Sequence, residues 1–225
     1  MLFIEIGQNF GEHTTHLLPF LITIFIVWLS LILYSYKKYG LKHTIIYFVP
    51  MIIAALFIES AGVASGRYYY PGYIIYLSIV GGGVPLLIIL AWSANLFLFF
   101  SLAKHVVYRL YQKCNRLQII ATAATAGFFG ICLDLLEDPL AHHNNWWIWT
   151  EDIPGINFYG VPLTNFMGWF LLIFFMSLAT LLIERSRFTE NRKVILSITS
   201  ISITGVIIFI VHGIISRIFT SIGLS

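Results

Sequence analysis

The chain has 225 residues, of which 59% are hydrophobic and only 10% are charged. A soluble globular domain carries about 25% charged residues, so this chain could not cover its own surface with polar groups. The composition therefore excludes a soluble domain and predicts an integral membrane protein. The formal net charge of +3 has a topological explanation, given below, so nucleic acid is not an expected partner.

Long apolar runs predict an all-α polytopic membrane protein that forms a single integral membrane domain over residues 1–225. A helix needs roughly 20 apolar residues to cross a bilayer. The six predicted spans, in chain order, are 17–36, 44–62, 83–103, 118–137, 162–183 and 194–216. The stretch 71–82 is also apolar, but it begins with Pro-Gly and ends in a glycine run, so we expect a re-entrant or interfacial segment there, or a seventh helix.

The basic residues predict the orientation. They follow the first, third and fifth spans, which places eleven of the 13 Lys and Arg residues on one side: Lys37, Lys38, Lys42, Lys104, Arg109, Lys113, Arg116, Arg185, Arg187, Arg192 and Lys193. By the positive-inside rule this side is cytoplasmic. We therefore expect a multi-pass cell-membrane protein with both termini on the non-cytoplasmic side. The basic loop 104–117 is expected to contact anionic lipid headgroups.

An internal repeat relates residues of about 44–103 to those of about 118–183, with the helices 17–36 and 194–216 on either side. Each copy has an acidic residue, two aromatic residues 9 and 11 positions later, then Gly-Val-Pro-Leu, then a tryptophan. The first copy is Glu59, Tyr68, Tyr70, Gly83-Val84-Pro85-Leu86 and Trp92; the second is Asp138, Trp147, Trp149, Gly160-Val161-Pro162-Leu163 and Trp169. Two spans separate the copies, which predicts parallel repeats.

Each part of the repeat also has a structural explanation. Gly-Val-Pro is a good helix start, Asp138 before Pro139 is a candidate N-cap, and Gly62 with Gly66 could pack two helices together. Tryptophan and tyrosine near a membrane face commonly form an interfacial belt. Caps and belts do not, however, require acidic residues matched in position to aromatic pairs, which favours a functional site.

Three carboxyl groups strengthen this interpretation. Asp134, Glu137 and Asp138 lie within about one helical turn, where residues three and four apart share a face. Three neighbouring carboxylates repel one another, so we expect at least one to remain protonated near neutral pH. A carboxylic acid surrounded by aromatic rings could protonate an alkene, whose carbocation the rings would stabilise, and a neighbouring carboxylate could deprotonate a water.

At these residues the sequence resembles the carotenoid hydratase family, which includes bisanhydrobacterioruberin hydratase and the lycopene and gamma-carotene hydratases. The resemblance covers about residues 55–170. It lies in Glu59, Gly62, Gly66, Tyr68, Tyr70, Gly83-Val84-Pro85, Asp134, Asp138-Pro139, Trp147, Trp149, Tyr159-Gly160-Val161-Pro162, Asn165-Phe166 and Gly168-Trp169. It implies a hydro-lyase that adds water, without a cofactor, to the terminal double bond of an acyclic or monocyclic carotenoid.

Roles for individual residues follow as hypotheses. Asp134 or Asp138 is the expected general acid, Glu59 the base or water-orienting group, and Glu137 a further catalytic carboxyl. The expected substrate-binding residues are Tyr68, Tyr70, Trp92, Trp147, Trp149, Asn165 and Trp169. The sequence departs from the resembling family at Glu137, where leucine is usual, and at His142–Asn145, where the family loop is less polar; these departures concern the substrate more than the reaction type.

Two other functions stay open at this point. Imidazoles and carboxylates near the outer face (Glu12, His13, His16, His142 and His143) could bind zinc or iron in a lipid hydroxylase or desaturase. Their spacing is a weak signal, so no metal is expected. Parallel repeats with intramembrane carboxylates also occur in transporters, so a non-catalytic lipid or ion carrier is the second alternative. The hydroxyl residues of 194–216 are expected to form interhelical hydrogen bonds. A lipophilic carotenoid and membrane lipids are the expected partners.

Overall fold

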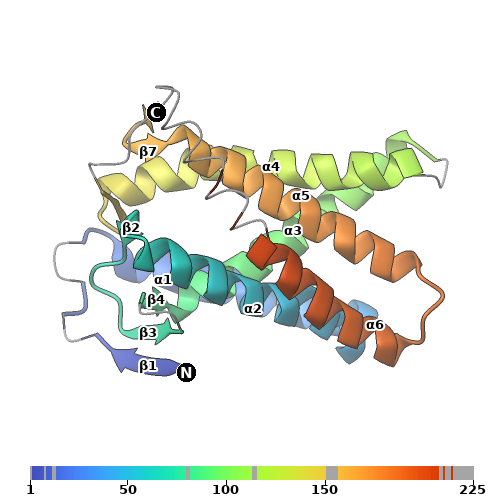
Figure 1. Ribbon diagram of the computed structural model, residues 1–225, viewed down its shortest axis with the longest axis horizontal. Coiled ribbons are helices and arrows are strands. Elements are labelled where there is room, and N and C mark those ends of the chain that lie inside the picture. The colour runs from blue at the N-terminus through green and yellow to red at the C-terminus, as the bar shows by residue number, and fades with distance from the viewer. Residues whose placement is uncertain are drawn as a thin grey trace.

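The computed structural model describes residues 2–7, 9–11, 14–79, 82–112, 116–150 and 157–207, together with 210 and 214. Its five long helices are α1 (Leu17–Tyr39), α2 (Leu41–Ala64), α3 (Leu86–Leu110), α4 (Arg116–His143) and α5 (Leu163–Arg185) (Figure 1). Each is long and apolar enough to cross a membrane. The chain is thus an all-α multi-pass membrane protein, and the first five predicted spans are confirmed as helices.

The sixth predicted span begins in the described part of the chain. Helix α6 (Glu190–Leu196) continues into a π-helical turn, η1 (Ser197–Ile201), and then into α-helix over 202–207. The remainder of 194–216 lies almost entirely outside the described residues. The prediction of interhelical hydrogen bonds is wrong for the hydroxyls that have partners here. They donate to carbonyls three or four residues back in the same helix: Ser197, Thr199, Ser200 and Thr204. Such local bonding competes with the regular helical ladder.

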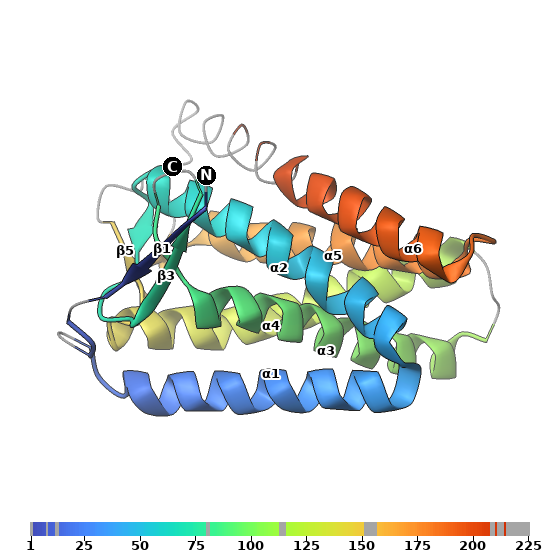
Figure 2. The same cartoon turned by 90° about the horizontal axis from the view of Figure 1, so that it is seen from below.

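The helices form a bundle in which α1 and α6 lie on opposite sides (Figure 2). Helix α1 packs on α2 and α3, whereas α6 and η1 pack on α2 and α5. The largest shared surface is between α4 and α5. Fully buried apolar side chains from α2, α3 and α5 form the core, among them Met51, Ile89 and Ile173. Helix α1 keeps most of its side chains exposed, as a helix that faces lipid does.

Short strands at one end of the bundle were not expected from the sequence (Figure 1). Strands β1 (Phe3–Ile6), β3 (Ile75–Ser78) and β4 (Val84–Pro85) form one antiparallel sheet, β2 (Tyr68–Tyr69) pairs with β5 (Ile148–Trp149), and β6 (Asn157–Phe158) with β7 (Val161–Pro162). The described part of 71–82 therefore contains strand β3 and no helix. The alternative of a seventh helix is wrong there, because this stretch pairs with β1 and β4 beside the helix ends. A re-entrant or interfacial position for this segment stays a prediction.

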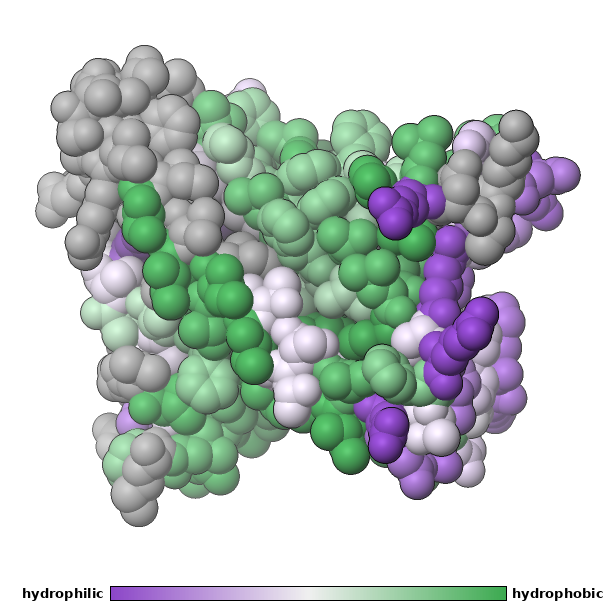
Figure 3. Space-filling view, turned by 45° about the vertical axis from the view of Figure 1, so that its right-hand side comes forward, coloured by the Kyte–Doolittle hydropathy of each residue, from purple (hydrophilic) through white to green (hydrophobic). Residues whose placement is uncertain are grey.

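The two ends of the bundle differ in polarity. Figure 3 shows hydrophilic residues gathered at the end where α1 joins α2 and α5 joins α6, and hydrophobic side chains over the helices between the ends. The expected long loop 104–117 is mostly helical, since α3 continues to Leu110 and α4 starts at Arg116. The basic residues do gather at one end, but which side of the membrane this end faces stays a prediction.

Candidate functional site

Glu59 is the centre of the first group of polar residues, at the end of the bundle opposite the basic residues. It lies in the last turns of α2 and is 6% exposed. Its Oε2 accepts hydrogen bonds from the hydroxyls of Tyr68 (2.8 Å) and Tyr70 (2.7 Å), and its Oε1 accepts one from Trp92 Nε1 (2.7 Å). These donors compensate for the removal of the carboxyl group from water.

Two glycines shape this group. Helix α2 ends near Gly66, which has a φ of +74°, a conformation that glycine adopts without strain. The chain then turns back so that Tyr68 reaches Glu59. A Cβ on Gly62 would lie 2.2 Å from the Tyr68 hydroxyl. The proposal that Gly62 and Gly66 pack two helices together is therefore wrong, because Gly62 makes room for a tyrosine of the site.

Asp134 and Asp138 form the second group, one helical turn apart on α4, and are 0% and 3% exposed. Their carboxyl groups lie within hydrogen-bonding reach of each other. Asn165 Nδ2, in the first turn of α5, lies 3.1 Å from Asp134 Oδ2 and 2.6 Å from Asp138 Oδ2. Two carboxyl groups can form a hydrogen bond only when one carries a proton. The arrangement therefore suits a pair that shares a proton.

Helix α4 runs past Asp138 and Pro139 to His143. The N-cap explanation of Asp138 is therefore wrong, since this residue lies inside the helix. Pro139 lacks an N–H and so leaves a carbonyl one turn earlier without its helical donor. The indole of Trp147, 7% exposed, is close enough to Asp138 to donate a hydrogen bond.

Strands β2 and β5 bring the aromatic residues of the two repeat copies together. Tyr68 pairs with Trp149 and Tyr69 with Ile148. The rings of Tyr68 and Trp149 meet edge to face, with centroids 4.9 Å apart, and Tyr70 contacts Trp147 at 6.1 Å. The interfacial-belt explanation does not fit these rings, because they pack on one another, and because Tyr68 and Tyr70 donate to Glu59.

The residues around Glu59 and the residues around Asp134 and Asp138 are neighbours in space. Trp92 and Trp169 pack against each other with ring centroids 4.1 Å apart. Burial raises the pKa of the Tyr68 hydroxyl well above its ordinary value, and the nearby carboxyls of Glu59 and Asp138 add to this, whereas Arg67 acts in the opposite direction. Tyr68 thus lies within the electrostatic field of both carboxyls. The structure brings together all the residues expected to bind substrate.

The sequence did not single out several aromatic residues that complete the site. Trp146 stacks on Phe20 of α1 at 4.0 Å and donates to the Thr15 carbonyl (2.6 Å). Tyr73 is 2% exposed and contacts Tyr70. Trp146 directly precedes the aromatic pair of the second copy, which could have marked it, whereas Tyr73 has no counterpart in the repeat.

Comparison with known protein families identifies the family to which the chain belongs. The family described as "Carotenoid biosynthesis protein" matches residues 19–225. The chain belongs to the carotenoid biosynthesis protein family. No curated protein and no solved structure matches it. Membership of this family supports a role for the chain in carotenoid biosynthesis.

The histidines proposed for a metal site in this carotenoid biosynthesis protein do not gather with carboxyl groups in the described part of the chain. No three His, Cys, Asp or Glu side chains are arranged there to hold a metal ion. His142 has a buried Nδ1 without a hydrogen-bond partner and packs against Gly160. Glu12 and His13 lie outside the described residues.

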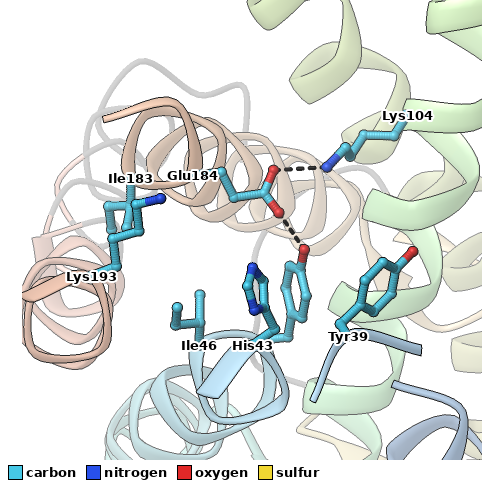
Figure 4. A pocket seen from close by; sticks show the side chains of 8 residues that line it. Tyr39, His43, Ile46, Lys104, Ile183, Glu184 and Lys193 are labelled. Atoms are coloured by element: carbon cyan, nitrogen blue, oxygen red, sulfur yellow. Dashed lines mark hydrogen bonds and ion pairs between the residues drawn. The ribbon is translucent and has the colours of Figure 1, made fainter. Parts of the chain in front are cut away.

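A separate cluster of charges lies at the basic end (Figure 4). Glu184 accepts hydrogen bonds from Tyr47 and from Lys104 Nζ, the latter at 2.7 Å, and so links α2, α3 and α5. A cavity of about 250 Å³ lies beside Glu184. Its lining residues are Tyr39, His43, Ile46, Tyr47, Lys104, Ile183, Glu184 and Lys193. Nearby, Arg185 donates to Tyr108 (2.7 Å) and Gln118 (2.6 Å). These contacts join the basic helix ends to one another.

Proposed function

We propose that this protein is a hydro-lyase that adds water to a terminal C=C bond of an acyclic or monocyclic carotenoid, such as bisanhydrobacterioruberin, lycopene or gamma-carotene. Membership of the carotenoid biosynthesis family supplies the substrate class. The observation that carries the reaction type is the buried Asp134–Asp138 pair, which lies beside aromatic rings and a second carboxyl centre. The resemblance to carotenoid hydratases supports the same reaction.

The aspartate pair is the proton donor in this mechanism. A proton shared between two buried carboxyl groups is held away from bulk water but remains transferable. Its transfer to the terminal alkene forms a C–H bond and leaves a tertiary carbocation. Asn165 donates to both aspartates and so positions the pair. A well-placed general acid contributes about 10²–10⁴-fold to a rate.

The remaining residues of the site stabilise the carbocation. The faces of aromatic rings attract cations, and Tyr68, Tyr70, Trp147 and Trp149 lie in mutual contact beside the carboxyl groups. Glu59 is fixed by its three hydrogen bonds, and its charge would stabilise the cation without rearrangement of the site. Hydration changes no oxidation state overall, so the reaction requires no redox cofactor.

Pigment analysis in a host that makes acyclic carotenoids tests this proposal. Expression of the wild-type chain should give a tertiary alcohol whose oxygen derives from ¹⁸O-labelled water, and Asp138→Asn should abolish it. An oxygen atom derived from O₂, together with stoichiometric iron or zinc in the purified protein, would establish the hydroxylase instead. Flux across proteoliposomes without any product would establish the carrier.

The orientation is part of this proposal. The basic end is assigned to the cytoplasm by the positive-inside rule, which places the carboxyl site near the opposite, non-cytoplasmic face. A reporter fused after Tyr39, between α1 and α2, should report a cytoplasmic position, and a reporter inserted after Tyr69 should report a non-cytoplasmic one. The reverse result would invert the assignment but leave the reaction unchanged.

A further inference from the structure

The cavity beside Glu184 is a second place where a ligand could bind. Its volume is about 250 Å³, and its lining residues come from α1, α2, α3, α5 and α6. Sites for drug-sized ligands have volumes of about 300–1,000 Å³, so this cavity suits a small chemical group and not a carotenoid. It lies at the opposite end of the bundle from the carboxyl groups of the candidate site, Glu59, Asp134, Glu137 and Asp138.

Two lysines supply the cavity with hydrogen-bond donors. Lys104 and Lys193 lie on opposite sides of it (Figure 4), with side chains that are 31% and 15% exposed. Lys104 Nζ donates to Glu184 (2.7 Å) and Lys193 Nζ to Glu190 (3.2 Å). An ammonium group has three N–H donors. Each lysine therefore keeps two donors that no residue in the described part of the chain accepts.

The carboxylate in the cavity is already occupied. Glu184 Oε1 accepts a hydrogen bond from Tyr47, and its Oε2 accepts one from Lys104. Glu190 is not a lining residue; its Oε2 lies 3.9 Å from His43 Nε2, which is too far for a hydrogen bond. The charged groups of the lining thus offer unused donors, whereas each oxygen of their one carboxylate has a partner. This favours an anionic ligand over a cation.

The balance of charge around the cavity points in the same direction. Lys38 Nζ lies 5.1 Å from the ring centre of Tyr39, which lines the cavity. With the two lysines of the lining it makes three positive charges against the two carboxylates of Glu184 and Glu190, without counting His43. The other basic residues of this end add to the excess. Basic pockets between membrane helices are known to bind phosphate-bearing lipid headgroups.

We propose that this cavity binds a phosphate group, to which Lys104 and Lys193 donate hydrogen bonds from opposite sides. An anionic phospholipid and phosphate in solution both carry this group. The apolar lining residues Ile46 and Ile183, and the hydrophobic surface that adjoins the polar end (Figure 3), favour the lipid. The inference is independent of the proposed hydration, because it uses none of the carboxyl groups of that site.

Ligand titration of the purified protein in detergent tests this inference. Thermal unfolding is followed at one ionic strength with phosphatidylglycerol, phosphatidylcholine or inorganic phosphate, because a ligand that binds the folded state stabilises it. Phosphatidylglycerol should bind more tightly than the net-neutral phosphatidylcholine. Lys193→Gln should weaken its binding about tenfold, in the range of one hydrogen bond to a charged group. Lys193→Arg should retain most of the affinity.

A second variant and a matched control accompany this one. Lys104 and Glu184 are changed together, as Lys104→Gln with Glu184→Gln, because removal of one partner would leave a buried charge unpaired. This double variant should also weaken binding about tenfold. Lys37 is an exposed lysine of the same end that does not line the cavity. Lys37→Gln should therefore bind phosphatidylglycerol as the wild type does.

The three ligands distinguish the sources of the phosphate group. Stabilisation that depends on Lys193 and occurs with phosphatidylglycerol alone would assign the site to a lipid headgroup, whereas the same dependence with inorganic phosphate would assign it to the phosphate group itself. Unchanged binding in Lys193→Gln, or equal weakening in Lys193→Gln and Lys37→Gln, would overturn the inference. Equal binding of the two lipids, or no stabilisation by any of the three ligands, would overturn it as well.

Discussion

Glu59 and Asp138 hold equivalent positions in the sequence repeat, yet their surroundings differ. Glu59 accepts three hydrogen bonds from neutral donors. The Asp138 carboxyl group instead lies within hydrogen-bonding reach of the Asp134 carboxyl group and accepts a hydrogen bond from Asn165. At the repeat offsets of 79 and 77 residues, Asp134 corresponds to Ala55 and Asn165 to Ile88. The second copy therefore has polar residues where the first has apolar ones, and this gives the two buried carboxyls different surroundings.

The aromatic pairs complete this comparison. Tyr68 faces Trp149 and Tyr69 faces Ile148 across β2 and β5, and Trp92 packs on Trp169. This is the arrangement that a two-fold axis between the copies would produce. Such an axis would place two equivalent carboxyls around one space, where their hydrogen bonds differ; under the proposed function this difference makes Asp138, with Asp134, the proton donor.

The largest effect is expected at the aspartate pair. Asp134→Asn and Asp138→Asn should each lower hydration by about 10²–10⁴-fold, because neither variant can hold a proton between two carboxyls. The double variant should be little worse than either single one, since residues that act as a unit are not additive. Product formation by purified protein measures this. Additive losses would show that the two aspartates act separately.

Glu59→Gln should have the next largest effect. It removes a fixed negative charge beside the carbocation and should lower hydration by roughly 10²-fold, while deuterium uptake by the alkene from the acid persists in part when the protein is incubated in D₂O. Measurement of both rates in one D₂O incubation would sharpen the contrast between the two carboxyl centres. If the loss in Glu59→Gln equalled that in Asp138→Asn for both rates, the division of roles would be wrong.

Gly62→Ala is expected to have a moderate effect. The added Cβ would come within 2.2 Å of the Tyr68 hydroxyl and push it away from Glu59. Hydration should fall several-fold, in the range of a single hydrogen bond of about 1 kcal/mol. In a Tyr68→Ala background, which removes the whole ring that the Cβ would meet, the same substitution should cost much less. An undiminished loss in that background would show that Gly62 acts through backbone packing.

The last prediction concerns stability and distinguishes the two packed tryptophans, Trp92 and Trp169. Trp92→Phe leaves Glu59 with one donor fewer and should lower the free energy of unfolding by about 1–3 kcal/mol more than Trp169→Phe does. Both variants lose similar ring area, so the difference isolates the hydrogen bond. Thermal unfolding in detergent measures it. Equal losses would mean that Glu59 finds a replacement donor.

The sequence singled out most residues of the candidate site but not the contacts between them. The spacing of Glu59, Tyr68 and Tyr70 marked them as a group, since a repeated pattern stands out in a chain with so few charges. Nothing in that spacing showed that Tyr68 and Trp92 donate to Glu59 while Asn165 bridges the aspartates. Tyr73 was not singled out because it lies between the aromatic pair and Gly-Val-Pro-Leu, where the two copies share no pattern. What marks it is a buried hydroxyl without a hydrogen-bond partner among the described residues.

The sequence by itself determined the membrane class and five of the helices, because the hydrophobic effect acts on composition and length. Because so few residues of the chain are charged, the sequence also singled out the carboxyl groups that lie in or beside its apolar segments. Only the tertiary structure decided that β2 meets β5, that Ile75–Ser78 forms a strand, and that Asp138 lies inside a helix. These depend on contacts between residues distant in the chain, whose hydrogen-bond partners no local pattern specifies.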